Sequence, residues 1–134
     1  MATPDKTTLL RVFNKHLFEF LDDIIRIFPD SIDIKASRNS FELYKKANPT
    51  ILVKVWFTYI YKPYADIIDG GDIDFFVNKD YSQDLSYMAN SKDILKIIDG
   101  LRTPIRDMSD ANRSHSLEYM QNLCKLSNMY NLVS

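Results

Sequence analysis

A long amphipathic helix near the start of the chain is the strongest constraint on the fold. At 100° per residue, the apolar side chains between positions 7 and 28 fall within one arc, and charged side chains cover the opposite side. Pro29 ends this helix, because proline disfavours helical geometry in the residue before it. The predicted helix 7–28 buries a stripe of Leu10, Phe13, Leu17, Phe20, Leu21, Ile24, Ile27 and Phe28.

The surface of this helix carries two further features. Asp22 and Arg26 are spaced for an i,i+4 ion pair. Phe18 and Ile25 lie at the margin of the apolar arc, where they either widen the buried stripe or contact a second chain. Both interpretations of the margin stay open on sequence alone.

The segment that follows 7–28 predicts a second helix. Ser31 or Asp30 can cap its start, since both side chains accept hydrogen bonds from free backbone N–H groups. The helix runs to about Ala47, and its polar centre between 36 and 40 makes a break possible. Its expected core contacts are Ile34, Phe41 and Tyr44.

The stretch from 49 to 62 is compatible with helix or strand. Its run ILVKVWFTYIY is β-branched and aromatic, which suits a buried strand at about 50–61. Pro49 also suits the first turn of a helix that runs to about Lys62. We favour the helix because the sequence offers no clear partner strand, and a lone strand leaves its backbone groups unpaired.

The rest of the chain also favours short helices. Pro63 interrupts the preceding helix, and Gly70-Gly71 supplies the backbone freedom for a reversal. Further helical segments are expected at 64–69, after a cap at Asp72 or Asp74, at 91–101 and at about 110–132. The sequence therefore predicts one all-α domain over 1–134, a compact bundle of five to seven helices with 7–28 as its central strut. The alternative is an α+β fold with a strand at about 50–61.

Composition restricts the compartment and the partners. The chain of 134 residues fits one domain with a real core. Its single cysteine excludes an intrachain disulfide and favours a reducing compartment. The start lacks the order of a secretory signal, and no apolar run reaches the roughly 20 residues of a membrane span. We therefore expect a soluble protein that is not secreted and not inserted in a membrane.

Charge is segregated along the chain although the net charge is only −1. Residues 35–62 hold six basic residues against Glu42, and residues 63–84 hold six aspartates against Lys79. These segments are either two solvated surfaces of opposite sign, or surfaces that face each other within one fold or between copies. A two-fold dimer would pair each segment with its opposite.

An acidic turn at 69–74 is the best candidate for a metal site. Asp69, Asp72 and Asp74 resemble the Asp-x-Asp pairs with which nucleotidyltransferases hold magnesium, because hard cations prefer carboxylate oxygens. The match is poor, since the glycines directly abut Asp72 and no serine follows them. We favour aspartates that cap helices, and we expect no cofactor.

The positions of the cysteine and the two histidines in the sequence do not favour nucleophilic catalysis. His115 and Cys124 are nine residues apart on one predicted helix, so they point in opposite directions. His16 would reach Cys124 only through tertiary packing, and a buried helix cysteine is usually part of the core. We therefore expect no enzymatic activity.

Aromatic residues interleaved with lysines suggest an alternative role in binding single-stranded nucleic acid. Trp56 and Tyr59 could stack on bases, and nearby lysines could contact phosphates. The competing interpretation is a core helix whose lysines reach solvent. The residues that would carry the nucleic-acid role are Lys45, Lys46, Lys54, Trp56 and Tyr59.

Two stretches carry a resemblance. FNKHLFEFLDDIIRIFPD at 13–30 and YKPYADIIDGGDIDFFVNKDY at 61–81 are similar to small uncharacterised proteins of nucleocytoplasmic large DNA viruses. The shared pattern is an amphipathic helix ending in Phe-Pro, then Pro-Tyr-x-x-x-Ile, an acidic turn and Phe-Phe-x-x-x-Asp-Tyr, over roughly residues 13–81. The resemblance implies a virus-encoded protein of the host cytoplasm, the viral factory or the virion, and it assigns no catalytic residue.

These observations favour a non-enzymatic interaction or structural protein, such as a virion component or an assembly adaptor. Its partner would be another virion protein or a second copy of the chain. The two charge segments would set the orientation, because complementary charge mainly governs register and association rate. The residues expected to form the contact are Phe18, Ile25, Trp56, Tyr59 and Tyr64.

Overall fold

The computed structural model describes residues 5–71 and 102–133, and its regular structure in these ranges is helical throughout. The elements are α1 (Lys6–Ile27), α2 (Ile32–Ala47), α3 (Ile51–Trp56), the π-helical turn η1 (Phe57–Tyr61), α4 (Lys62–Asp69), α8 (Arg102–Arg106) and α9 (Asp110–Val133). The all-α prediction is confirmed, and the alternative strand at about 50–61 is wrong. The helices expected after Asp72 or Asp74 and at 91–101 lie outside the described residues.

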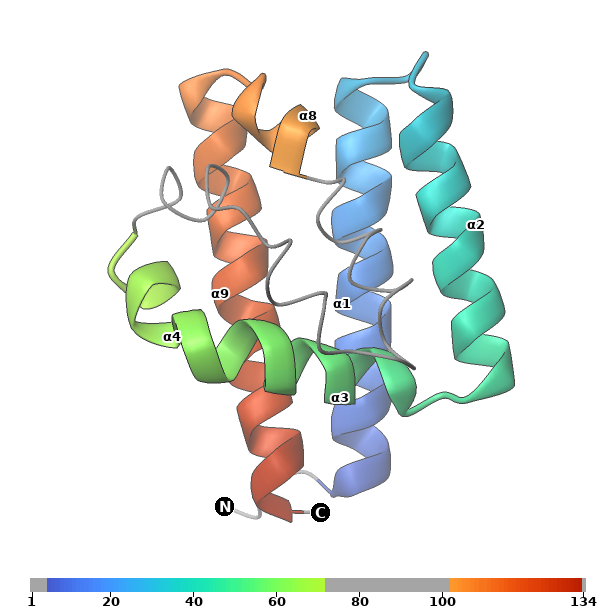
Figure 1. The fold of residues 1–134 in the computed structure, drawn as a ribbon, viewed down its shortest axis with the longest axis vertical. Helices are drawn as coiled ribbons and strands as arrows, with labels where there is room; N and C mark the ends of the chain where they lie inside the picture. The colour runs from blue at the N-terminus through green and yellow to red at the C-terminus, as the bar shows by residue number, and fades with distance from the viewer. Residues whose placement is uncertain (1–4, 72–101, 134) are drawn as a thin grey trace.

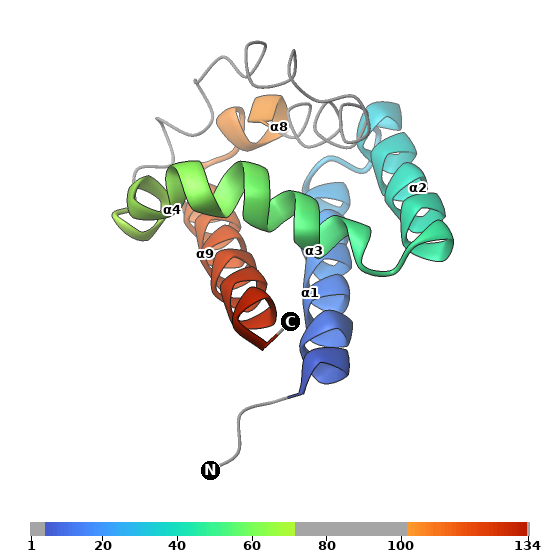
Figure 2. The same cartoon turned by 60° about the horizontal axis from the view of Figure 1, so that its bottom comes forward.

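The helices pack around an antiparallel pair. α1 and α9 lie side by side, and α2 covers the other flank of α1 (Figure 1). The continuous stretch formed by α3, η1 and α4 crosses both members of the pair, which the turned view shows as well (Figure 2). α1 contacts α9, α2 and α3, whereas α9 contacts α1, α3, η1, α4 and α8, so within the described ranges α9 and not the predicted helix 7–28 is the most connected helix.

α1 forms where the sequence predicts it, within one residue at each end. The Asp5 carboxylate accepts a hydrogen bond from the Thr8 backbone N–H at 2.7 Å, which caps the first turn. At the other end the backbone N–H of Phe28 donates to the Ile24 carbonyl, and Pro29 follows. The cap at Asp5 and the stop at Pro29 thus give α1 the same length that its apolar periodicity indicates.

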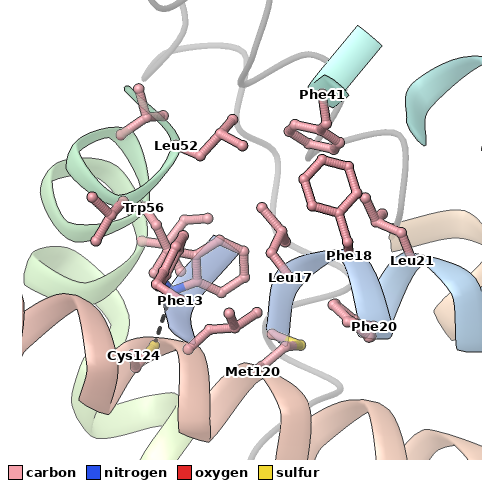
Figure 3. Close-up of a cluster of buried hydrophobic side chains, with 14 of the residues drawn as sticks. Phe13, Leu17, Phe18, Phe20, Leu21, Phe41, Leu52, Trp56, Met120 and Cys124 are labelled. Atoms are coloured by element: carbon pink, nitrogen blue, oxygen red, sulfur yellow. Dashed lines mark hydrogen bonds between the residues drawn. The ribbon is translucent and has the colours of Figure 1, made fainter. Parts of the chain in front are cut away.

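The core lies where these helices meet. Phe13 and Phe20 of α1 are completely buried, and the ring of Phe13 meets Trp56 edge-on with 6.3 Å between centroids (Figure 3). Edge-to-face contacts of this kind add to the stabilisation from apolar burial. Other large buried side chains come from α2, α3, η1, α4 and α9: Phe41, Leu52, Ile60, Ile68, Met120 and Leu123.

α2 is one continuous helix, so the possible break between 36 and 40 does not occur. Ser31 caps it, with its hydroxyl accepting from the Ile34 N–H at 3.4 Å. Arg38, near the middle of the helix, binds the Asp22 carboxylate of α1 at 2.6 Å. The predicted pair between Asp22 and Arg26 is wrong, because Arg26 instead pairs with Asp23 at 2.6 Å.

The chain also remains helical through Pro63, where an interruption was expected. Proline has no N–H to donate, so a helix that continues through it lacks one hydrogen bond of its regular series. The chain accommodates this with a π-helical turn, in which the Lys62 N–H donates to the Phe57 carbonyl five residues back. The predicted third and fourth segments are therefore one helical stretch from 51 to 69.

α4 ends at Asp69, directly before the glycine pair Gly70-Gly71, and the direction of the chain beyond Gly71 lies outside the described residues. Gly71 adopts a φ of 83°, a left-handed conformation that glycine reaches without steric cost. Its N–H donates to the Ile68 carbonyl at 3.1 Å, which closes the end of α4. The side-chain amide of Gln121 in α9 donates to the same carbonyl at 3.0 Å and ties this end to the core.

Candidate interaction surfaces

The fold corrects the surface role expected for Trp56 and Tyr64. The Trp56 side chain is only 2% exposed and Tyr64 is also buried. Trp56 is enclosed between Phe13 of α1 and Cys124 of α9, and its indole N–H donates to the cysteine sulfur (Figure 3). A partner protein cannot reach either side chain in this conformation, so both belong to the core.

The margin residues of α1 are covered as well. Phe18 is buried beneath α2, with the Arg38 guanidinium carbon 5.3 Å and the Lys45 Nζ 5.1 Å from its ring centroid. Cations at this distance over an aromatic face are attracted to it. Ile25 and Tyr59 are half-buried and pack against the core. The margin of the apolar arc therefore widens the buried stripe.

The residues of the nucleic-acid alternative do not form one surface. Lys45, Lys46 and Lys54 are exposed, which fits phosphate contacts. Trp56 lies in the core, so it offers no face for a base to stack on, and Tyr59 is half-buried. The aromatic half of this proposed site is therefore missing from the described surface.

The acidic turn is only partly within the described residues. Asp69 is exposed at the end of α4, whereas Asp72 and Asp74 lie outside the described ranges. Over 5–71 and 102–133, no three His, Cys, Asp or Glu side chains are grouped so that they could hold a metal ion. The metal alternative involving Asp69 therefore stays a prediction.

The cysteine and the histidines take separate places. Cys124 is buried, and burial raises the pKa of its thiol to about 11 although the Trp56 N–H opposes the shift. His115 is exposed on the same helix, as expected from the spacing of nine residues. His16 packs on Tyr119 of α9 with 4.9 Å between ring centroids.

α2 carries an exposed apolar stripe that was not predicted from the sequence. Ile32 is 80% exposed and Leu43 is 68% exposed. Their separation of eleven residues places them on one side of the helix, together with the exposed Ala36 and Asn39. We call these four residues the α2 outer stripe.

The spacing that reveals this stripe was available in the sequence. Ile34 and Phe41, which are buried, face inwards on the same helix and were correctly taken as core residues. A helix with a second apolar side opposite its core side has more apolar surface than its own domain covers. Once Ile34 and Phe41 are assigned to the core side of α2, the helical spacing places Ile32 and Leu43 on the opposite side.

No protein-family model matches the chain, and no curated protein or solved structure does either. Within the described ranges, none of the helices is both long enough and apolar enough to cross a membrane.

Proposed function

We propose that this protein is a non-enzymatic interaction or structural protein that docks on a partner through the α2 outer stripe. The resemblance to proteins of large DNA viruses supports a role as a virion component or assembly adaptor, in the host cytoplasm, the viral factory or the particle. The partner is a protein whose apolar surface is bordered by acidic side chains. The observation that carries the proposal is the exposure of Ile32 and Leu43 on one side of a helix.

The energetic argument starts from the exposed area. Full burial of an aliphatic side chain of this size is worth about 1.5–3 kcal/mol. Ile32 and Leu43 contribute little of this to the fold, because most of their surface remains in water. A partner that covers both side chains would gain that free energy.

The stripe sits on a helix that is already rigidly placed. The inner side of α2 is anchored by Ile34 and Phe41 in the core. The guanidinium of Arg38 adds ion pairs to Asp22 at 2.6 Å and to Glu42 at 3.4 Å. Little order has to be created when a partner binds, which reduces the entropic cost of association.

The charged residues beside the α2 outer stripe indicate the sign of the charge on the partner's surface. Lys35 and Lys46 are exposed at positions next to the stripe on the helical wheel. Exposed lysines favour an acidic border on the partner and raise the rate of association. This retains the orienting role of the basic segment 35–62, with the aromatic contact residues replaced by aliphatic ones.

The test compares two matched substitutions of exposed leucines. Leu43→Glu changes the stripe, and Leu132→Glu changes a leucine on α9 that is 73% exposed. Tagged wild-type protein and both variants are used to purify partners from infected or native lysate, followed by quantitative mass spectrometry. We expect Leu43→Glu, and equally Ile32→Glu, to lose the partners that wild type and Leu132→Glu both retain.

Two readouts decide the outcome. Equal thermal unfolding midpoints of the variants show that lost binding reflects the surface and not misfolding. Retention of the same proteins by Leu43→Glu would contradict the stripe. Light scattering at low and high salt distinguishes self-association, since a dimer disrupted by Leu43→Glu would identify a second copy as the partner.

A further inference from the structure

A groove between α1 and α2 forms a second concave surface, separate from the α2 outer stripe. Its volume is about 560 Å³, which is in the range of ligand sites. The α1 residues that line it extend from Thr7 to Asp22, a distance of about 22 Å at 1.5 Å per residue. α2 contributes the opposite wall, and Pro49 of the following loop also lines it.

The groove is apolar in part and carries cations that form no ion pair. Leu10, Phe18 and Pro49 supply apolar surface. Of the lining charges, Arg38 pairs with two carboxylates and Lys15 lies 3.9 Å from Glu19. Arg11 and Lys45 form no ion pair with any residue that the structure describes. The groove is thus lined by four basic side chains and by the carboxylates of Glu19, Asp22 and Glu42, and the positive charge that forms no ion pair with a described residue lies at Arg11 and Lys45 beside the apolar surface.

Asn14 provides an independent indication of a ligand. It lines the groove and is 5% exposed, and its Nδ2 donates to the Pro49 carbonyl at 3.1 Å. Its Oδ1 is buried and accepts no hydrogen bond from any described residue. A buried acceptor without a donor costs about 1–3 kcal/mol, so a donor brought by a ligand would relieve this penalty.

We propose that the α1–α2 groove binds an acidic peptide segment in an extended conformation. Its carboxylates pair with Lys45 and Arg11, and an apolar side chain packs on Leu10 and Pro49. A backbone N–H of the peptide donates to Asn14 Oδ1. These three contacts match the three kinds of group that the groove presents.

The length of the groove favours a peptide over a small anion. An extended chain rises about 3.3 Å per residue, so about seven residues fill the 22 Å from Thr7 to Asp22. A single carboxylate or phosphate would satisfy one cation and leave the apolar surface in water. Burying that surface requires a ligand with apolar side chains of its own.

The experiment uses two blocked peptides and the full chain. The acidic probe is acetyl-Glu-Leu-Glu-Phe-Glu-amide, and the neutral probe replaces each glutamate with glutamine. Backbone amide shifts of the ¹⁵N-labelled protein are followed by NMR during titration with each peptide. We expect saturable shifts at groove residues, and about tenfold tighter binding of the acidic peptide, since exposed ion pairs each contribute up to about fivefold.

Substitutions of exposed lysines provide the matched control. Lys45→Gln should weaken the acidic peptide about fivefold, whereas Lys46→Gln changes a neighbour that does not line the groove and should leave binding unchanged. Equal affinity for both peptides would overturn the proposal, as would shifts outside the groove or no saturation. The same shifts produced by acetate or inorganic phosphate alone would also overturn it, in favour of a simple anion site.

Discussion

The indole N–H of Trp56 donates a hydrogen bond to the sulfur of Cys124, with 3.4 Å between the atoms and 68 positions between the residues. This contact joins α3 to α9 in the middle of the core (Figure 3). A buried indole needs an acceptor, and the thiol supplies one without introducing a charge. The most polar atoms of both side chains are thereby satisfied inside an apolar cluster.

This contact predicts that Cys124 is unreactive while the protein is folded. Burial raises the pKa of the thiol to about 11. At pH 8 only about one thiol in a thousand is then the reactive thiolate, and the reagent must also enter the core. Ellman's reagent should react at a rate that follows global unfolding in urea. Rapid stoichiometric reaction in native buffer would contradict the buried contact.

Two neighbouring positions on α2 should differ sharply in stability. Phe41→Ala removes a completely buried ring and should lower the free energy of unfolding by about 3–5 kcal/mol. Leu43→Ala changes a side chain of the α2 outer stripe and should alter it by less than about 0.5 kcal/mol. Equilibrium unfolding in urea measures both. A large loss for Leu43→Ala would mean that the stripe serves the fold instead of a partner.

Gly71 should tolerate substitution poorly because of its backbone conformation. With φ at 83°, any residue with a Cβ is strained there, and Gly71→Ala should cost about 1–2 kcal/mol. Crowding is not the cause, since an added Cβ would lie 3.9 Å from Leu117 Cδ2 in ordinary contact. Gly71→Asn should cost less, because asparagine visits this region more easily. Equal urea midpoints for all three proteins would contradict the assigned turn.

Periodicity in the sequence was sufficient for the length of α1, whereas the all-α fold class also needed the absence of a partner strand for residues 50–61. The apolar arc and the stop at Pro29 locate that helix within a residue at each end. The same logic identified α2 and its inner residues Ile34 and Phe41. These features are local, since they depend on spacing and caps that a single helix carries by itself.

Which side chains are exposed could not be predicted in the same way, because the exposure of a side chain depends on the other helices that pack against it. Phe18 is at the margin of its helix, and only the position of α2 decides whether it meets solvent. Trp56 resembles a recognition residue in sequence and is enclosed by α1 and α9 in the fold.

His16 predicts how the stability of the fold depends on pH. It packs against Tyr119 of α9, and its Nδ1 lies 4.0 Å from the Glu19 carboxylate. Its Nε2 is buried and has no hydrogen-bond partner among the described residues. Burial lowers the pKa of His16 below 6.5, and the opposing effect of Glu19 is smaller. The folded state therefore prefers the neutral imidazole.

The sign of the effect follows from this preference. Above pH 6.5 the imidazole is neutral in both folded and unfolded chains, and its full contribution to stability is present. As the pH falls below 6.5 the unfolded chain takes up the proton first, so the free energy of unfolding decreases until the lower pKa of the folded state is passed. We expect urea unfolding between pH 7.5 and 5.5 to show this loss in wild type and a smaller one in His16→Gln. Equal slopes for His16→Gln and wild type would contradict the assignment.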